Sequence, residues 1–397
     1  MHLSGCRSNL NILTSRIREI RLKIPPNVYT LESFLEYIVD NQETVFGPEN
    51  QPKWLKAHLI FTTRNWKDIF RVLQPEDYGD ITHIIFLNTK DGTQATEFYA
   101  YEWAPGLIMM FTSSTKDEYE QTLKQFIVDN RGITESWIRP SIFEEMKNFL
   151  LSKHDAQIYR FISRRYRHWL TPAQIRPEYD RRINYSGEDA AQTMKEYRTL
   201  YGAIPISIDM RIYGSKIQIN RNGLFIIRHI TRKTLGVLQE MTDTIAAKQA
   251  RLQDTSEKFH AKTKTLSVGE GEIKIPSIVA GKITLLRSKL SELMIKRMFR
   301  QIDVYEIGKS ELENEEFEQV FSFIDTFVSK EEPLIFSATV VDEVKGTIFG
   351  ISGTDDKVAL IPKHRTTFES FVNFYNFVTE NFDEAAELTT FNETLLA

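Results

Sequence analysis

Residues 204 to 230 read IPISIDMRIYGSKIQINRNGLFIIRHI. Apolar and polar residues alternate along this stretch, which predicts three strands over 204–213, 216–220 and 224–229. Asn222 and Gly223 separate the last two strands, and this dipeptide readily takes up the positive φ angles of a two-residue hairpin. A helix is expected directly afterwards, because apolar residues recur at helical spacing at Leu235, Leu238, Met241 and Ile245. The stretch therefore predicts an antiparallel sheet with a helix on one face and a second face free to meet a partner.

Two further segments repeat this order of elements. Strands are predicted over 81–88, 97–103 and 107–112 in the first, followed by a helix that opens on a capping box of Thr115 and Glu118. In the second they are predicted over 334–341, 347–352 and 357–361, and Thr366 with Glu369 has the same capping pattern. Helical patterns also precede the three segments, around 31–39, 191–201 and 317–328. A triplicated unit and three unrelated meanders both fit, and the weak residue identity between segments favours the second interpretation.

Helical insertions are expected between these units. Residues 133–170 are predicted to be rich in helix, and helices around 234–266 and 283–299 could pair as an antiparallel arm with its tip at 266–278. The expected fold class is α+β, with up to three α-β-β-β-α units that contain antiparallel sheets. Five regions follow: an N-terminal α+β unit (1–140), a basic helical connector (141–203), a central basic sheet (204–233), the helical arm (234–300) and an acidic C-terminal α+β unit (301–397).

Composition restricts the class of protein. The chain has 397 residues, enough for more than one core, and no run of about 18 apolar residues that could cross a membrane. Its single cysteine, Cys6, excludes an intramolecular disulfide and suits a reducing compartment, so a cytoplasmic location is expected. Residues 3–6 resemble a lipoprotein cleavage box, but the two residues before them are too few for a secretory signal.

Charge is strongly segregated along the chain. Residues 156–233 contain 15 Lys and Arg against 6 Asp and Glu, whereas residues 301–397 contain 6 against 20. A basic region attracts polyanions even when the whole protein carries a net charge of only −4. The sequence therefore predicts a polyanionic or acidic partner for the middle of the chain.

Arginines alternate with aromatic residues from residue 159 onward. If this segment is helical, Arg160, Arg164 and Arg167 share one face, where guanidinium groups could bind phosphates. Tyr159, Tyr166 and Trp169 could stack on unpaired bases. The full predicted nucleic-acid interface consists of basic and aromatic residues of this segment and of the central sheet: Arg160, Arg164, Arg165, Tyr166, Arg167, Trp169, Arg181, Arg182, Arg211, Lys216, Arg221 and Arg228. A protein interface, neutralisation by the acidic end of the chain and a solvated surface remain alternatives.

Catalytic signatures are sparse. The eight histidines do not form a metal-ligand spacing with one another or with the cysteine, and no glycine-rich phosphate loop or nucleophile elbow occurs, so no metal or cofactor is expected. The only candidate is a weak one: Glu270 and Glu272 with Lys274, an acid-x-Lys pattern of the kind found in Mg²⁺-dependent nucleases.

The leading hypothesis is a non-catalytic nucleic-acid-binding protein within a larger nucleic-acid-processing or defence assembly. One alternative is a scaffold subunit that binds proteins through the 234–300 arm or the acidic end, and another is a nuclease centred on Glu272 and Lys274. No membrane partner is expected.

Overall fold

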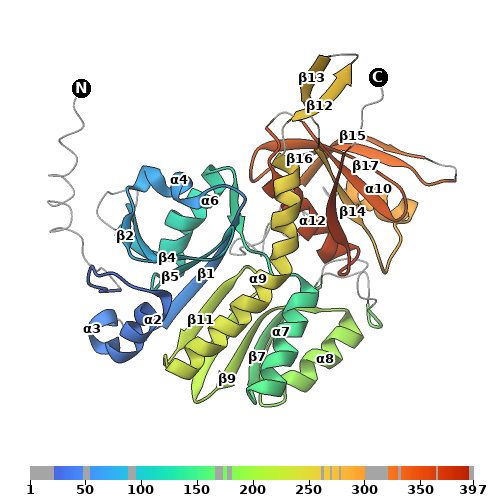
Figure 1. Ribbon diagram of the computed structural model, residues 1–397. Helices are drawn as coiled ribbons and strands as arrows, with labels where there is room; N and C mark the ends of the chain where they lie inside the picture. Colours follow the sequence, from blue (N-terminus) through green and yellow to red (C-terminus); the bar gives the residue numbers. More distant parts are fainter. Residues whose placement is uncertain are drawn as a thin grey trace.

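The computed structural model describes residues 22–47, 54–87, 95–165, 173–176, 181–260, 263–268, 271–276, 279–299, 321–329, 332–363 and 365–392. Helices and strands occur in similar amounts, and neighbouring strands pair in antiparallel fashion in every sheet. The α+β class predicted from the sequence is confirmed (Figure 1).

The larger sheet has eleven strands and combines the first two predicted β-β-β segments. In spatial order its main path is β2 (Glu76–Tyr78), β3 (Ile81–Leu87), β4 (Ala95–Ala104), β5 (Leu107–Thr112), β1 (Trp54–Thr62), β11 (Leu224–Arg228), β10 (Ser215–Asn220), β9 (Ile204–Ile212), β7 (Gln157–Arg165) and β8 (Arg181–Ser186), and β6 (Ile133–Glu135) pairs with β1. Because β1 joins β5 to β11, this sheet crosses the expected boundaries at residues 140 and 203. The division into folding units stays a prediction.

The smaller sheet contains the third predicted segment. Its order is β15 (Phe321–Val328), β16 (Phe336–Asp342), β17 (Thr347–Gly353), β18 (Lys357–Pro362), β14 (Val279–Thr284) and β19 (Glu387–Asn392). A separate hairpin of β12 (Thr263–Val268) and β13 (Gly271–Pro276) extends beyond the end of the long helix α9 (Arg232–His260) (Figure 1).

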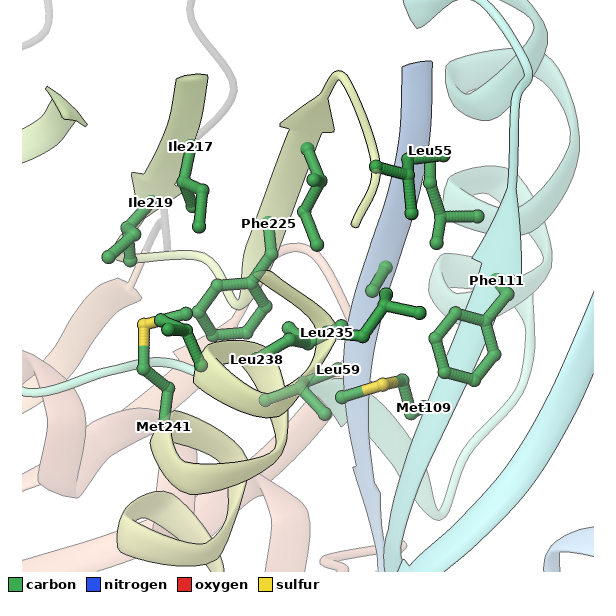
Figure 2. Close-up of a cluster of buried hydrophobic side chains, with 14 of the residues drawn as sticks. Leu55, Leu59, Met109, Phe111, Ile217, Ile219, Phe225, Leu235, Leu238 and Met241 are labelled. Atoms are coloured by element: carbon green, nitrogen blue, oxygen red, sulfur yellow. The ribbon is translucent and has the colours of Figure 1, made fainter. Parts of the chain in front are cut away.

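Helices cover the larger sheet unequally. One face lies under α2 (Leu31–Asp40), α3 (Gln42–Phe46), α7 (Pro140–Lys153), α8 (Ala190–Tyr201) and α9, and Figure 2 shows Leu235, Leu238 and Met241 of α9 facing Phe225 and Leu59 of the strands. On the opposite face, α4 (Trp66–Phe70), η2 (Arg71–Leu73), α5 (Lys116–Tyr119), η3 (Glu120–Lys124) and α6 (Gln125–Asp129) pack over β1 and β3–β5 only. The hydrophobic clusters of the described residues contain no helix packed on this second face of β7–β11, although Ser207, Asp209 and Ile226 of that face are buried.

Helix α9 belongs to both cores. Its first half packs in the cluster of the larger sheet, and Leu252 in its second half packs in the cluster of the smaller sheet, beside α10 (Glu292–Phe299) and α12 (Phe368–Asn381). Its amphipathic face thus continues from one sheet to the other.

Three helix predictions are wrong in whole or in part, although α7 lies within the helix-rich stretch expected at 133–170 and α10 (Glu292–Phe299) within the helix expected around 283–299. Residues 157–165 form strand β7, which pairs with β9 and β8 and places Ile158 and Phe161 in the core. Residues 279–284 form β14 of the smaller sheet, so the helical arm does not exist, and deletion of 250–280 would remove buried Leu252 and Ala280. Residues 321–328 form β15, in which aromatic and β-branched residues favour the extended chain.

The expected capping box of Thr366 and Glu369 is also absent. Helix α12 begins after Thr367, and Glu369 instead accepts a hydrogen bond from the backbone amide of Thr63, 3.2 Å away. Glu369 is therefore used in the contact between the two sheets. The capping box of Thr115 and Glu118 is confirmed.

A half-buried lysine joins the two sheets at the end of α6. Lys345, in the turn between β16 and β17, donates from Nζ to the backbone carbonyls of Ile127, Asn130 (3.2 Å) and Ile133 (2.9 Å). Burial lowers the pKa of this ammonium group to about 8. The last carbonyls of a helix lack partners within the helix, so Lys345 supplies donors that α6 itself cannot provide.

We expect Lys345→Met to destabilise the protein by about 1–3 kcal/mol, because it leaves buried carbonyl groups without donors. Urea unfolding followed by circular dichroism measures the change, with Lys195→Met on the exposed surface of α8 as the control. An unchanged unfolding midpoint for Lys345→Met would show that the contact adds nothing to stability.

Candidate nucleic-acid interface

The uncovered face of β7–β11, here called the open face, is built by strand alternation. Ile208, Met210 and Ile212 of β9 lie in the core beneath the helices, so Ser207, Asp209 and Arg211 point the other way. The same period places Lys216, Gln218 and Asn220 of β10 on the open face, opposite core residues Ile217 and Ile219. The polar residues of the sequence pattern are thus gathered on one surface.

A row of basic residues crosses this surface. Strand register aligns Trp54 of β1 with Arg228 of β11, Arg228 with Lys216 of β10, and Lys216 with Arg211 of β9. Arg211 and Lys216 are exposed, and Arg228 is half-buried. Because adjacent strands lie about 4.8 Å apart, the row spans roughly 14 Å from β1 to β9.

A β-bulge in β7 extends the row. The register between β7 and β9 shifts between Ile158 and Arg160, and the core positions on either side, Ile158 and Phe161, are three residues apart. The additional residue lets both Tyr159 and Arg160 emerge on the open face. The bulge therefore places an aromatic ring next to a guanidinium group.

The cations on this face contact aromatic rings. The guanidinium carbon of Arg228 lies 4.3 Å from the ring centre of Trp54. Arg211 and Lys216 lie over the ring of Tyr159, at 5.2 and 5.8 Å. Among the described residues, none of these three cations forms a salt bridge, and the charge of Asp209 acts on Arg228 and Lys216 only from beyond salt-bridge distance.

One acidic residue, Asp209, lies among these cations. It is only 4% exposed, and its nearest cationic atom is Nη1 of Arg160, 3.9 Å from Oδ2. Burial raises the pKa of the Asp209 carboxyl group above its ordinary value, and the charges of Arg160, Arg228 and Lys216 oppose this shift without cancelling it. An ionised Asp209 on this face therefore lowers the free energy of unfolding.

The other predicted site residues lie in different places. Arg182 of β8 is exposed on the open face, opposite the buried Arg164 of β7. Arg165 is buried too, and Arg181 lies on the helix side of the sheet over the ring of Tyr201, at 4.5 Å. Arg160 and Arg164 share a strand face rather than the expected helix face, while Tyr166, Arg167 and Trp169 lie outside the described residues.

Arg221 is part of the contact between the sheets. Its side chain is 1% exposed, pairs with Glu380 of α12, and donates from Nε to the carbonyl of Ile138, 3.0 Å away. Such a position is inaccessible to a large ligand. The hypothesis that the acidic end neutralises the basic middle thus fits Arg221, and also Arg198, which lies 3.6 Å from Glu384.

The nuclease candidate residues lie on the β12–β13 hairpin. Glu272 and Lys274 belong to β13, where the register aligns them with Ser267 and Thr265, whereas Glu270 lies outside the described residues. Throughout the described part of the chain, no group of three His, Cys, Asp or Glu side chains is arranged to hold a metal ion. No described helix is long and apolar enough to span a membrane.

Sequence reasoning missed Trp54 and Asp209. Trp54 is distant in sequence and reaches the row only through the pairing of β1 with β11. Asp209 could have been found, because it occupies a polar position between Ser207 and Arg211 in the alternating pattern of β9.

A family model matches the part of the chain that contains β7–β10 of this surface, but not β11 or Trp54. Residues 142–220 match the model of the AF_0896_M family middle domain, and this span includes Arg160, Asp209, Arg211 and Lys216. A protein of Archaeoglobus fulgidus described as uncharacterized is 22% identical over 388 residues, which cover 92% of this chain and 98% of that protein. The similarity to this relative therefore extends over nearly the whole chain.

We expect Asp209→Asn to raise the thermal stability of the free protein at pH 7. Burial raises the pKa in the folded state, so the folded protein binds this proton more tightly than the unfolded chain, and stability falls as the pH rises through that pKa. Asparagine removes the ionised form, and its advantage should shrink as the pH approaches 4 and wild-type Asp209 becomes protonated.

Thermal unfolding of both proteins between pH 4 and 8 measures this difference, with Asp254→Asn, at an exposed position of α9, as the control. A less stable Asp209→Asn variant at pH 7 would mean that attraction to the surrounding cations outweighs burial of the carboxylate.

Proposed function

We propose that the protein binds nucleic acid through the open face of β7–β11. The observation that supports this most directly is the row of Arg211, Lys216 and Arg228, whose charges contact aromatic rings and are not paired with carboxylates among the described residues. The expected class of partner is kept. Of the two parts of the expected interface, the central sheet is kept, and the arginine-rich segment contributes through strands β7 and β8 instead of a helix.

The chemistry of the row suits a phosphate backbone. Guanidinium groups form bidentate hydrogen bonds with phosphate oxygens, and each neutralised phosphate releases condensed counterions. A flat sheet face with basic and aromatic side chains can contact several successive nucleotides. Binding to this surface requires no catalytic group, which agrees with the non-catalytic role expected from the sequence.

A role inside a larger nucleic-acid-processing or defence assembly is part of the same proposal. The protruding β12–β13 hairpin offers an element for contact with another subunit, as the scaffold hypothesis requires (Figure 1). The scaffold and nuclease alternatives stay predictions.

Charge reversal tests the proposed surface. The double variant Arg211→Glu, Lys216→Glu should bind single-stranded oligonucleotides at least tenfold more weakly than wild type at about 100 mM salt, because two phosphate contacts become repulsive. The slope of log K against log salt should become shallower by about 0.7 for each lost contact. Fluorescence anisotropy with a labelled oligonucleotide measures both quantities.

Lys195→Glu, Lys233→Glu is the matched control, since it makes the same change in net charge at exposed positions on the helices α8 and α9, which cover the opposite face. Equal losses in the two double variants would indicate attraction by net charge alone and would remove the open face as the binding surface. Absence of salt-sensitive binding by the wild type near 50 mM salt would overturn the proposed function.

A further inference from the structure

We infer that the open face holds an unpaired nucleotide, whose base stacks on Tyr159 and donates N–H hydrogen bonds to the carboxylate of Asp209. This inference rests on the proposed function and adds the form of nucleic acid and the edge of the base that is recognised. It starts from a polar group that the fold leaves without a partner.

Asp209 is a buried hydrogen-bond acceptor without a donor. Among the described residues no hydrogen bond to its carboxylate is found, the contact with Arg160 is an ion pair at 3.9 Å, and the 4% of the residue that remains exposed leaves the carboxylate within reach from the solvent. Buried carboxylates normally accept several hydrogen bonds, because water has been removed from them. An unsatisfied acceptor on a surface that otherwise suits ligand binding indicates that a ligand supplies the donor.

The charge of Asp209 restricts which part of a nucleotide can lie beside it. A phosphate oxygen would be repelled, whereas the N–H groups of a base edge can donate to a carboxylate. Phosphates can instead contact Arg211 and Lys216, which lie over the ring of Tyr159. A single nucleotide would therefore place its base next to Asp209 and its phosphate next to the basic row.

Tyr159 contributes to the same site. The β-bulge brings its ring to the open face next to Arg160, and the strand register aligns Arg160 with Asp209 of β9. Proteins that bind single strands commonly stack exposed bases on such rings. In a duplex the bases stack on each other and their pairing edges are occupied, so a duplex cannot make these two contacts without unpairing.

Guanine matches a carboxylate best. Its pairing edge presents two adjacent donors, N1–H and the N2 amino group, which can bond to both carboxylate oxygens at once. Adenine and cytosine offer one amino group, and uracil offers a single imide N–H. The site should therefore favour guanine over uracil at one position of a bound strand.

Fluorescence anisotropy tests the inference with octameric oligouridine strands, each of which carries guanine, inosine, adenine, cytosine or uracil at one central position. The guanine strand should bind wild type about 5- to 150-fold more tightly than the uracil strand, with inosine between them because it lacks the amino group. Asp209→Asn should abolish this preference while keeping the salt dependence. Tyr159→Leu should weaken binding of every single strand about 5- to 150-fold. The guanine strand paired with its complement should bind more weakly than the free strand.

Unfolding midpoints of both variants show whether they remain folded, and Asp254→Asn controls for loss of a negative charge. Salt-sensitive binding with equal affinity for all five strands, or a guanine preference that survives Asp209→Asn, would overturn the inference and leave the proposed function standing. Tighter binding of the duplex would overturn it in the same way. Absence of binding to any strand or duplex would overturn both.

Discussion

One-sided burial of the sheet strands is the constraint on which the rest of the structure depends. Helices α7, α8 and α9 bury every second residue of β7, β9, β10 and β11, and the remaining residues must then point to the opposite face. Over β1 and β3–β5 that second face has its own helices, but over β7–β11 it carries Arg, Lys, Tyr and Asp side chains. The same alternation that builds the core therefore defines the proposed binding surface.

Stability and binding oppose each other on the open face. Neighbouring cations and a buried carboxylate without a hydrogen-bond donor do not favour folding, whereas Lys345 and Arg221 at the contact between the sheets have the partners their charges require. Groups that are unfavourable in the free protein often belong to sites where a ligand supplies the missing partner. The contrast between Asp209 and Arg221 separates a binding role from a structural one.

Local sequence patterns predicted nine of the nineteen strands in the described part of the chain. The strand triplets around 81–112, 204–229 and 334–361 are confirmed because alternation and turn residues are local signals. The helix-rich stretch expected at 133–170 is wrong over 157–165, and the helix expected around 283–299 is wrong over its first residues, which belong to β14. Residues 321–328 of the helix expected around 317–328 form β15. These segments contain apolar residues at spacings that fit either period, and pairing with distant strands decided the outcome. No local sequence signal indicates that β1 joins the first two triplets into one sheet.

The candidate site was predictable only in part. Arg160, Arg182, Arg211, Lys216 and Arg228 were selected by charge and lie together on the open face, but charge alone also selected Arg221, which is buried between the sheets. The sequence contains no sign of the β-bulge that exposes Tyr159, because a bulge follows from the pairing of two strands.

Photocrosslinking to a single-stranded oligonucleotide that carries 5-iodouridine tests the central claim most directly, because it locates the contact on the folded protein. The account predicts crosslinks in peptides of β1, β7, β9, β10 and β11, with Tyr159 of β7 or Trp54 of β1 as the modified residue. Crosslinks confined to helices α7–α9 or to the smaller sheet would contradict it.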